Sequence, residues 1–432
     1  MSAFVLSWQD FWTRAALLAD RLKGDSKSSR IESKTKLWIP SLDAQQGLFL
    51  FAAALHLGLD PVFDEKSSLD LDATYLQSSP ELWQTFAKEQ GLPLDNSQFM
   101  LSADQGIPVG LLEAIEQRDY YFSSSGSTAK AKTLCKSAEG LLRESKVLQN
   151  LYGLQANSKI VALVRPFHIY GFLHSVLLPL TSAGSAVYWS TQLSLPTEEN
   201  GFPVHTDLTI TVPAHWSVLT HLWSDHRTPT VVSSGAFFGQ ERAAELLKHK
   251  ESFERYFEIL GSTETGGIGY RRVDQEGYAF TLFEGIRVEA RTDGGDGSLI
   301  YSPFLIPESS ISSPDRFEQL ADQRVLHLGR ADRVFKYAGL RYTLGEVEDM
   351  MSKACDGASV VCTFEENSNS PQGGLLRSWI ETRTLSAVDL IPLRKKYQSF
   401  GNRPFPAALH FVPEFPRDAQ GKVSFLELKR LI

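Results

Sequence analysis

Residues 37–63 read LWIPSLDAQQGLFLFAAALHLGLDPVF, and this stretch sets the expected fold class. The short apolar runs at its two ends are typical of buried strands, and the apolar run between them is typical of a helix. A strand, a helix and a second strand in succession form one βαβ-like unit. We therefore predict an α/β protein.

Four further β-rich runs follow, at residues 159–164, 185–190, 208–212 and 230–235, separated by helical stretches. Such alternation predicts a parallel sheet covered by helices. Ligands of these sheets bind beyond the carboxyl ends of the strands, so we expect the chemistry in the loops that follow these runs.

The last hundred residues have a different texture, typical of a small α+β domain. Its expected elements are a helix over 344–354, strands over 358–364 and 376–382, a helix near 385–399 and a strand over 408–412. The sequence thus predicts a large N-terminal α/β domain with mostly parallel sheets, residues 1–330, and a small C-terminal α+β domain, residues 331–432.

Composition limits the possible partners. The net charge of -8 gives no electrostatic reason to expect a nucleic-acid partner. The longest apolar runs are shorter than the roughly 20 residues that span a bilayer, so we expect no membrane partner and a cytoplasmic location.

The N-terminal stretch, residues 1–20, is expected to be an amphipathic helix. Cys135, Cys355 and Cys362 lack metal-ligand spacing and are expected to be buried thiols.

The segment YYFSSSGSTAKAKTL, residues 120–134, combines a β-rich approach with hydroxyl residues, a glycine and lysines. Small residues let backbone N–H groups approach phosphate oxygens, hydroxyls add donors, and lysine neutralises charge. The Walker spacing is absent, which disfavours a P-loop NTPase. By itself the segment is equally consistent with a simple turn before a helix.

Three later segments also carry candidate chemistry. In ILGSTETGGIGYRR, residues 259–272, Glu264 could hold Mg²⁺ beside a phosphate loop or could be a solvated turn residue. HLGRADRVFKYAGLRYTLGEVE, residues 327–348, lies at the junction of the two predicted domains. VPEFPRDAQGKVSFLELKRL, residues 412–431, places Lys422 in a turn before a terminal helix, where a lone lysine is normally on the surface.

Together the four segments resemble the acyl-adenylate-forming superfamily, which contains acyl- and aryl-CoA synthetases, adenylation domains and luciferases. The resemblance runs from about Tyr120 to the C-terminus. SSGSTAKAK stands for the family's [ST]SG[ST]TGxPK, LGSTE for YGxTE, GRADRVFKYAGLR for GRxDxxxKxxGxR, and PRDAQGK for PRxxxGK. Four matches in the family's order make coincidence improbable.

The resemblance implies ATP and Mg²⁺ as cofactors, a small-molecule carboxylic acid, either an aryl or a fatty acid, as substrate, and CoA or a carrier-protein phosphopantetheine as thiol acceptor. It implies catalytic roles for Lys422, Thr263 and Glu264, with Glu264 as the metal ligand. It implies a hinge at Asp332, about which the C-terminal domain rotates and brings the segment around Gly339 to the thiol entrance. The implied nucleotide-binding residues are Ser124, Ser125, Gly126, Ser127, Thr128, Lys132, Ser234, Gly235, Ala236, Asp315 and Arg330, and the implied substrate-binding residues are His168, Gly266 and Gly339.

Two of these assignments come from weaker features. PFHIYGF, residues 166–172, resembles the family segment that lines the acyl pocket, although His168 could equally be a core histidine. SSGAFF, residues 233–238, resembles the SGGA turn beside the adenine.

The sequence also departs from the family. Ala129 and Ala131 replace the loop's glycine and proline, and SPD at residues 313–315 is the nearest match to the usual TGD. The region before the phosphate segment is short, which resembles the compact AMP-ligases of bacterial aryl-polyene gene clusters. The alternatives are therefore transfer to an acyl carrier protein, and a catalytically inactive nucleotide-binding homologue. A serine hydrolase is disfavoured because G-x-S-x-G is absent.

Overall fold

The structure is a computed structural model. It describes residues 4–25, 35–40, 44–64, 75–76, 80–94, 98–123, 133–182, 184–190, 205–215, 219, 228–235, 243, 246–249, 251–275, 277–291, 297–321, 323–338, 340–367, 370, 372–382, 390–417, 423, 425–428 and 430.

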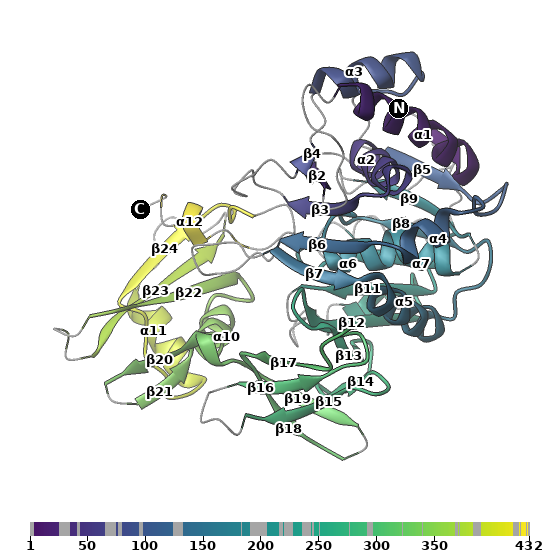
Figure 1. Ribbon diagram of the computed structural model, residues 1–432. Helices are drawn as coiled ribbons and strands as arrows, with labels where there is room; N and C mark the ends of the chain where they lie inside the picture. The colour runs from purple at the N-terminus through teal and green to yellow at the C-terminus, as the bar shows by residue number, and fades with distance from the viewer. Residues whose placement is uncertain are drawn as a thin grey trace. The chain divides into compact units, whose positions relative to one another are not determined.

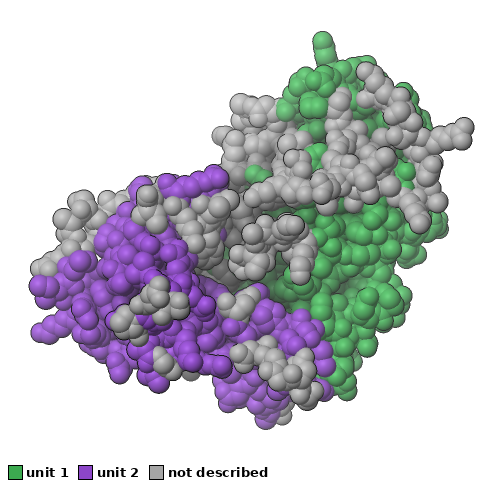
Figure 2. All heavy atoms as spheres, turned by 60° about the vertical axis from the view of Figure 1, so that its left-hand side comes forward, with its two compact units in different colours: residues 1–287, 301–311 green, residues 288–300, 312–432 purple. Residues whose placement is uncertain are grey.

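The chain forms two compact units, which Figure 2 distinguishes by colour. Unit 1 comprises residues 1–287 and 301–311, and unit 2 comprises residues 288–300 and 312–432. The predicted domain boundary between residues 330 and 331 lies inside unit 2 and stays a prediction.

The smaller sheet of unit 1 contains the strand–helix–strand unit predicted from residues 37–63. Its order is β4-β2-β3-β6-β7, in which β2, β3 and β6 run parallel and β7 returns antiparallel to β6. The strands are β2 (Lys36–Pro40), β3 (Asp60–Asp64), β4 (Tyr75–Leu76), β6 (Asp119–Ser123) and β7 (Thr133–Ser137). The connecting helix α2 (Ala44–Leu57) is buried and packs on β2 and β3, which confirms the prediction.

Within unit 1, the larger sheet has the strand order β1-β5-β9-β8-β10-β11-β12-β13-β14. Figure 1 labels β5, β9, β8, β11, β12, β13 and β14 of this sheet. Its strands are β1 (Phe4–Ser7), β5 (Gln98–Ser102), β8 (Lys159–Ala162), β9 (Ala186–Ser190), β10 (Leu208–Thr211), β11 (Thr230–Ser234), β12 (Arg255–Ser262), β13 (Gly266–Arg272) and β14 (Phe280–Leu282). The run from β9 through β8, β10 and β11 to β12 is parallel, as the four β-rich runs predict.

Helices line both sheets of unit 1. They are α1 (Trp8–Asp25), α3 (Pro80–Glu89), α4 (Leu111–Glu116), α5 (Ala138–Tyr152), α6 (Ile169–Phe172), the π-helical segment η1 (Leu173–Leu177) and α7 (Leu178–Thr181), with 3-10 turns η3 (Pro213–His215) and η4 (Leu247–His249). The prediction of a single N-terminal helix is wrong at its start, because Phe4–Ser7 pairs with β5 before α1 begins.

Aromatic packing fixes the segment around His168 in unit 1. The rings of Phe63 and Phe167 stack with centroids 6.0 Å apart. A Cβ atom on Gly47 would lie only 2.1 Å from Phe167, so the absent side chain of Gly47 admits this ring beside α2. The segment that resembles the acyl-pocket motif is therefore anchored to the smaller sheet.

Unit 2 is built mainly from antiparallel strands and two longer helices. Its strands are β18 (Asp315–Gln319), β19 (Arg324–Arg330), β20 (Val334–Tyr337), β21 (Leu340–Thr343), β22 (Ser359–Glu366), β23 (Gly374–Glu381) and β24 (Ala408–Val412). Three further strands contain residues of both units: β15 (Arg287–Ala290), β16 (Ser298–Tyr301) and β17 (Ser310–Ser313). The helices of unit 2 are η5 (Ala331–Arg333, a 3-10 turn), α10 (Leu344–Ala354), α11 (Leu390–Ser399) and α12 (Phe425–Leu428).

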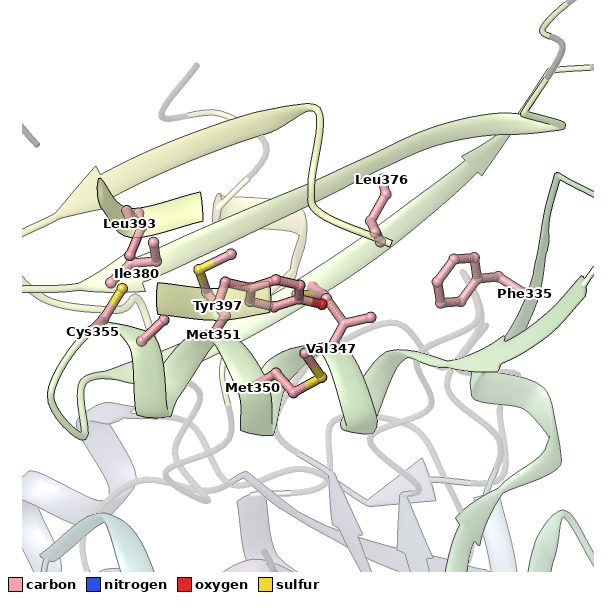
Figure 3. Packing of buried hydrophobic residues seen from close by; sticks show 11 residues of the cluster. Phe335, Val347, Met350, Met351, Cys355, Leu376, Ile380, Leu393 and Tyr397 are labelled. Carbon is pink, nitrogen blue, oxygen red and sulfur yellow. The ribbon is translucent and has the colours of Figure 1, made fainter. Parts of the chain in front are cut away.

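The C-terminal part of unit 2 has its own core. Thr343 begins α10 with a capping box, in which its side chain and that of Glu346 satisfy each other's backbone N–H groups. Figure 3 shows apolar side chains from α10, α11 and β23, among them Met351 and Tyr397, gathered between α10 and the sheet. The predicted fold class, a large α/β part followed by a small α+β part, is confirmed.

One of the three predictions of a buried thiol is wrong. Cys355 and Cys362 are buried, but Cys135 is exposed. Cys135 lies on β7, the edge strand of the smaller sheet, where successive side chains point to opposite faces. Its neighbour Lys136 takes the buried face instead.

Candidate active site

The parallel strands β10, β11 and β12 of unit 1 end at one edge of the larger sheet, and several predicted site residues follow them there. Ser234 closes β11, and its hydroxyl donates a hydrogen bond to the carbonyl of Ile259 on β12 at 2.9 Å. Gly235 follows with φ of 92°, a value in the left-handed region that glycine adopts without strain. This edge therefore holds the predicted adenine-side turn.

The turn between β12 and β13 carries Thr263 and Glu264. Ser262 and Thr265 close it reciprocally, because the backbone N–H of each donates to the side-chain oxygen of the other at 3.1 Å. Thr265 is 1% exposed, while Glu264 is half-buried. Within the described part of the chain, no hydrogen bond reaches the Glu264 carboxylate.

The predicted phosphate segment, residues 124–132, lies outside the described residues, but its two ends do not. Ser123 at the end of β6 pairs with Thr133 at the start of β7. Three residues further along β7, the side-chain nitrogen of Lys136 donates to the backbone carbonyl of Glu264 at 2.5 Å. The base of the phosphate segment and the Glu264 turn are therefore linked directly.

The segment around His168 reaches the same sheet edge. His168 is half-buried and precedes α6 as its N-cap, without capping the helix through its side chain. Two residues later, the hydroxyl of Tyr170 lies 3.0 Å from the carbonyls of Thr211 on β10 and Val232 on β11. Tyr170 thus holds the segment against the ends of two strands.

The π-helical segment η1 follows directly and contains a buried histidine. The Nδ1 atom of His174 lies 2.8 Å from the Tyr170 carbonyl, and its Nε2 atom lies 2.9 Å from the Tyr152 hydroxyl. The hydroxyl of Ser175 donates to the Gly171 carbonyl at 2.7 Å. Burial lowers the pKa of His174 to about 4, so the ring is neutral at pH 7.

In unit 2, Asp315 and Arg330 are opposite residues of the β18–β19 pair. Asp315 is 8% exposed and accepts hydrogen bonds from Ser313 at 2.7 Å and from His327 at 2.9 Å. Burial pushes the pKa of Asp315 up, but the hydrogen bonds from His327 and Ser313 outweigh burial and hold it below its usual value. Asp315 is therefore a fixed carboxylate with Arg330 beside it.

The predicted hinge residue Asp332 lies in η5, although its side chain is not among those described. The residues on both sides of Asp332 are anchored within unit 2, Ala331 through its backbone and Arg333 through its side chain. The N–H of Ala331 donates to the Pro314 carbonyl at 2.7 Å. The Arg333 guanidinium donates to Glu348 of α10 at 2.6 Å.

Several predicted site residues lie outside the described residues. They are Ser124, Ser125, Gly126, Ser127, Thr128, Lys132, Ala236, Gly339 and Lys422. On the two sides of Lys422, Arg417 and Val423 are described and form an antiparallel β-bridge with each other.

A magnesium ion fits the residues at the Glu264 turn. The described residues contain no group of three or more His, Cys, Asp or Glu side chains that could hold a metal by themselves. Mg²⁺ bound to a nucleotide needs only one or two carboxylates, since phosphate oxygens and water complete its octahedron. The Glu264 carboxylate matches that requirement.

Three residues at these sites were not predicted from the sequence: Lys136, His327 and Glu144, whose Oε1 atom accepts a hydrogen bond from the N–H of Gly267 at 2.7 Å. Glu144 offered a signal, because it lies on the apolar face of α5 with Leu141 and Leu148, where a charged residue is unexpected. Lys136 and His327 gave no comparable signal.

Among the described residues, no helix combines the length and apolar character that crossing a bilayer requires.

No protein-family model matches the chain. The chain is 28% identical over 311 residues to a protein of Halorhodospira halophila named 4-coumarate–CoA ligase, which covers 70% of this chain and 74% of that protein. It is 30% identical over 239 residues to a protein of the same name from Rhodobacter capsulatus, which covers 53% of this chain and 56% of that protein.

A solved structure with a similar fold is O-succinylbenzoate coenzyme A synthetase from Bacillus subtilis, in complex with ATP and a magnesium ion. The TM-score is 0.71 at 13% sequence identity, with 97% of this chain and 93% of that chain covered. At this identity the likeness shows the fold alone. The chain is therefore similar in sequence to proteins named 4-coumarate–CoA ligase and similar in fold to an ATP-bound coenzyme A synthetase.

Proposed function

We propose that this protein uses ATP and Mg²⁺ to convert an aryl carboxylic acid into an acyl-AMP and then into a thioester. One observation carries the proposal: Lys136 links the base of the phosphate segment to the backbone of Glu264, the candidate metal ligand. The link supports the proposal, in which the segment binds phosphates next to a carboxylate suited to Mg²⁺. The two relatives named 4-coumarate–CoA ligase support the same reaction class.

Each predicted residue has a role in this reaction. The segment from Ser124 to Thr128, with Lys132, binds the β- and γ-phosphates. Ser234, Gly235 and Ala236 lie beside the adenine, and Asp315 and Arg330 bind the ribose. Lys422 supplies a cation between the attacking carboxylate and the α-phosphate.

The reaction proceeds in two displacements. An oxygen of the acid's carboxylate attacks the α-phosphorus, the bond from that phosphorus to the bridging oxygen breaks, and pyrophosphate leaves. A thiolate then attacks the acyl carbon, and AMP leaves. Glu264 would hold Mg²⁺, which would neutralise phosphate charge, and the protein contributes mainly by positioning two anions against each other.

For the acid, the relatives' name favours an aryl acid over a fatty acid. His168 and Gly266 line the acid's site in this proposal. The hydrogen bonds of Tyr170 to the carbonyls of Thr211 and Val232 support this placement, because they anchor the His168 segment beside β10 and β11.

For the acceptor, the relatives' name favours CoA. The resemblance to compact AMP-ligases of aryl-polyene clusters favours the phosphopantetheine of an acyl carrier protein. Gly339 lies at the thiol entrance in either case, and Asp332 is the hinge that permits the change between the two half-reactions. The alternative of an inactive nucleotide-binding homologue is less favoured, because Lys132, Glu264 and Lys422 are all present.

The test is acid-dependent pyrophosphate release with ATP and Mg²⁺, across a panel of hydroxycinnamic, benzoic and medium-chain fatty acids. The proposal expects release with at least one aryl acid, followed by a thioester with CoA or with a phosphopantetheinylated carrier protein. Tight ATP binding without release for any acid would support the inactive homologue instead.

A further inference from the structure

Two buried ionisable side chains outside the predicted site hold the backbone of the Glu264 turn. Lys136 on β7 is 9% exposed, and its ammonium donates to the Glu264 carbonyl at 2.5 Å. Glu144 on α5 is 3% exposed, and its Oε1 atom accepts a hydrogen bond from the Gly267 N–H at 2.7 Å. The turn is thus bound on both sides of Thr265.

The two glycines of the turn fit closely around the Glu144 carboxylate. A Cβ atom on Gly266 would lie 2.7 Å from Oε2, and one on Gly267 would lie 2.7 Å from Oε1. Gly266 also has φ of 70°, in the left-handed region. Side chains at these positions would therefore displace the carboxylate or the turn.

Stability alone does not account for these two groups. Removing a charge from water costs several kcal/mol, and an apolar pair of similar size is often as stable. Burial accordingly lowers the pKa of Lys136 and raises the pKa of Glu144 to about 7. A buried donor and a buried acceptor aimed at one turn indicate that its position matters.

The chain connection relates this turn to the phosphate segment. Lys136 lies three residues after Thr133, which pairs with Ser123 at the base of residues 124–132. α5, which carries Glu144, starts directly after β7, with Ser137 as its N-cap. Lys136 and Glu144 therefore lie on the strand and the helix that directly follow the phosphate segment in the chain.

We propose that Lys136 and Glu144 are positioning residues, which hold the Glu264 turn at a fixed distance from the base of the phosphate segment. This proposal rests on the proposed function. In it, Glu264 and the phosphate segment share one metal-bound triphosphate, and a shift of the turn separates the metal ligand from the phosphates.

The test uses Lys136→Met and Glu144→Gln in the full chain. Lys146→Met and Glu139→Gln are matched controls, because both residues are on α5 and the Glu139 side chain is 58% exposed. Removing a group that orients a metal ligand typically costs 10-fold or more in metal affinity. We expect the Mg²⁺ concentration for half-maximal pyrophosphate release to rise roughly 10-fold in the two variants and to stay at the wild-type value in the two controls.

A double-variant cycle links the effect to Glu264. If Lys136 acts through Glu264, Lys136→Met should raise the Mg²⁺ requirement far less in a Glu264→Gln background than in the wild type. Additive effects of the two substitutions would contradict the proposal.

Amide hydrogen exchange supplies a readout that does not depend on activity. Exchange at residues 262–267 should accelerate in Lys136→Met and Glu144→Gln, and not in the controls. Unchanged exchange there, or a lower melting temperature with a wild-type Mg²⁺ titration, overturns the proposal. If the wild type releases no pyrophosphate with any acid, the proposed function fails, while the exchange rates still decide the positioning role. Two variants are used so that misfolding of one leaves the other to decide.

Discussion

The Nε2 atom of His327 lies 2.9 Å from Oδ1 of Asp315, within the β18–β19 pair of unit 2. Ser313 donates to the second oxygen, Oδ2, at 2.7 Å. Both oxygens of the predicted ribose-binding carboxylate are therefore oriented by neighbours. Its pKa stays below the usual value, so it is ionised at pH 7.

His327→Phe should weaken ATP use, because it removes a hydrogen bond that orients Asp315. A hydrogen bond of this kind contributes about 1 kcal/mol, which corresponds to roughly a fivefold rise in the KM for ATP. His327→Gln keeps an N–H donor and serves as the matched control. The KM for ATP in pyrophosphate release checks the prediction, and equal values for wild type and His327→Phe would contradict it.

Glu264→Gln should raise the Mg²⁺ requirement, because a neutral amide binds a hard cation less well than a carboxylate does. The turn should remain folded, since Ser262 and Thr265 close it without the Glu264 side chain. Magnesium titrations of pyrophosphate release at fixed ATP measure the effect. Glu254→Gln, at an exposed position just before β12, is the control and should titrate like the wild type. Superimposable curves for Glu264→Gln and wild type would remove Glu264 from the metal site.

Lys422→Ala and Asp332→Pro should separate the two half-reactions. Lys422→Ala should abolish acyl-AMP formation yet still convert supplied acyl-AMP to thioester. Asp332→Pro should adenylate but form little thioester, because proline fixes φ near -65° and resists the backbone change that rotation requires. Pyrophosphate and thioester are followed separately, with CoA and with a phosphopantetheinylated carrier protein. Equal loss of both half-reactions in both variants would exclude the alternation mechanism for this protein.

His174 and Glu144 should make opposite contributions to the pH dependence of stability. The folded pKa of His174, about 4, lies below the ordinary value of 6.5, so its contribution is present above pH 6.5 and is lost as the pH falls. The folded pKa of Glu144, about 7, lies above the ordinary value of 4.5, so its contribution is present below pH 4.5 and is lost as the pH rises. Between those ordinary values the two nearly offset each other.

His174→Gln should therefore expose the contribution of Glu144. From about pH 5 to pH 6.5, the free energy of unfolding should fall by about 2 kcal/mol more in the variant than in the wild type. Urea unfolding at several pH values measures this difference. His205→Gln, at an exposed histidine, should keep the wild-type profile. A parallel profile for His174→Gln would show that His174 titrates normally in the folded protein.

Local sequence signals predicted the fold well. The α10 helix begins and ends at the predicted residues, because Thr343 and Glu346 encode its start within three residues of each other. The parallel strands were also recognisable, since each is a short, continuously apolar run. The β1 strand was not recognisable, because it forms only through pairing with β5, in which Phe4 lies opposite Phe99 far along the chain.

In the candidate site, too, residues in local motifs could be predicted from the sequence, whereas residues that depend on distant partners could not. Glu264 and Asp315 could be proposed from the sequence because they lie in contiguous segments that resemble family motifs. Lys136 and Glu144 could not be assigned, because their partners Glu264 and Gly267 are 128 and 123 residues away. Cys135 and Lys136 point to opposite faces of the same strand, and only the packing of distant elements decides which face is covered.

The β-bridge between Arg417 and Val423 makes the segment that contains Lys422 tolerant of insertion on one side only. Lys422 is one peptide bond from Val423, so the anchored end sets its place along the chain. Residues added before Gly421 would lengthen the loop without moving that end, and each doubling of loop length costs only about 0.6 kcal/mol in closure entropy. A residue added between Lys422 and Val423 would shift the lysine itself by up to about 3.5 Å. Natural or engineered length variation in this loop should therefore accumulate on its N-terminal side.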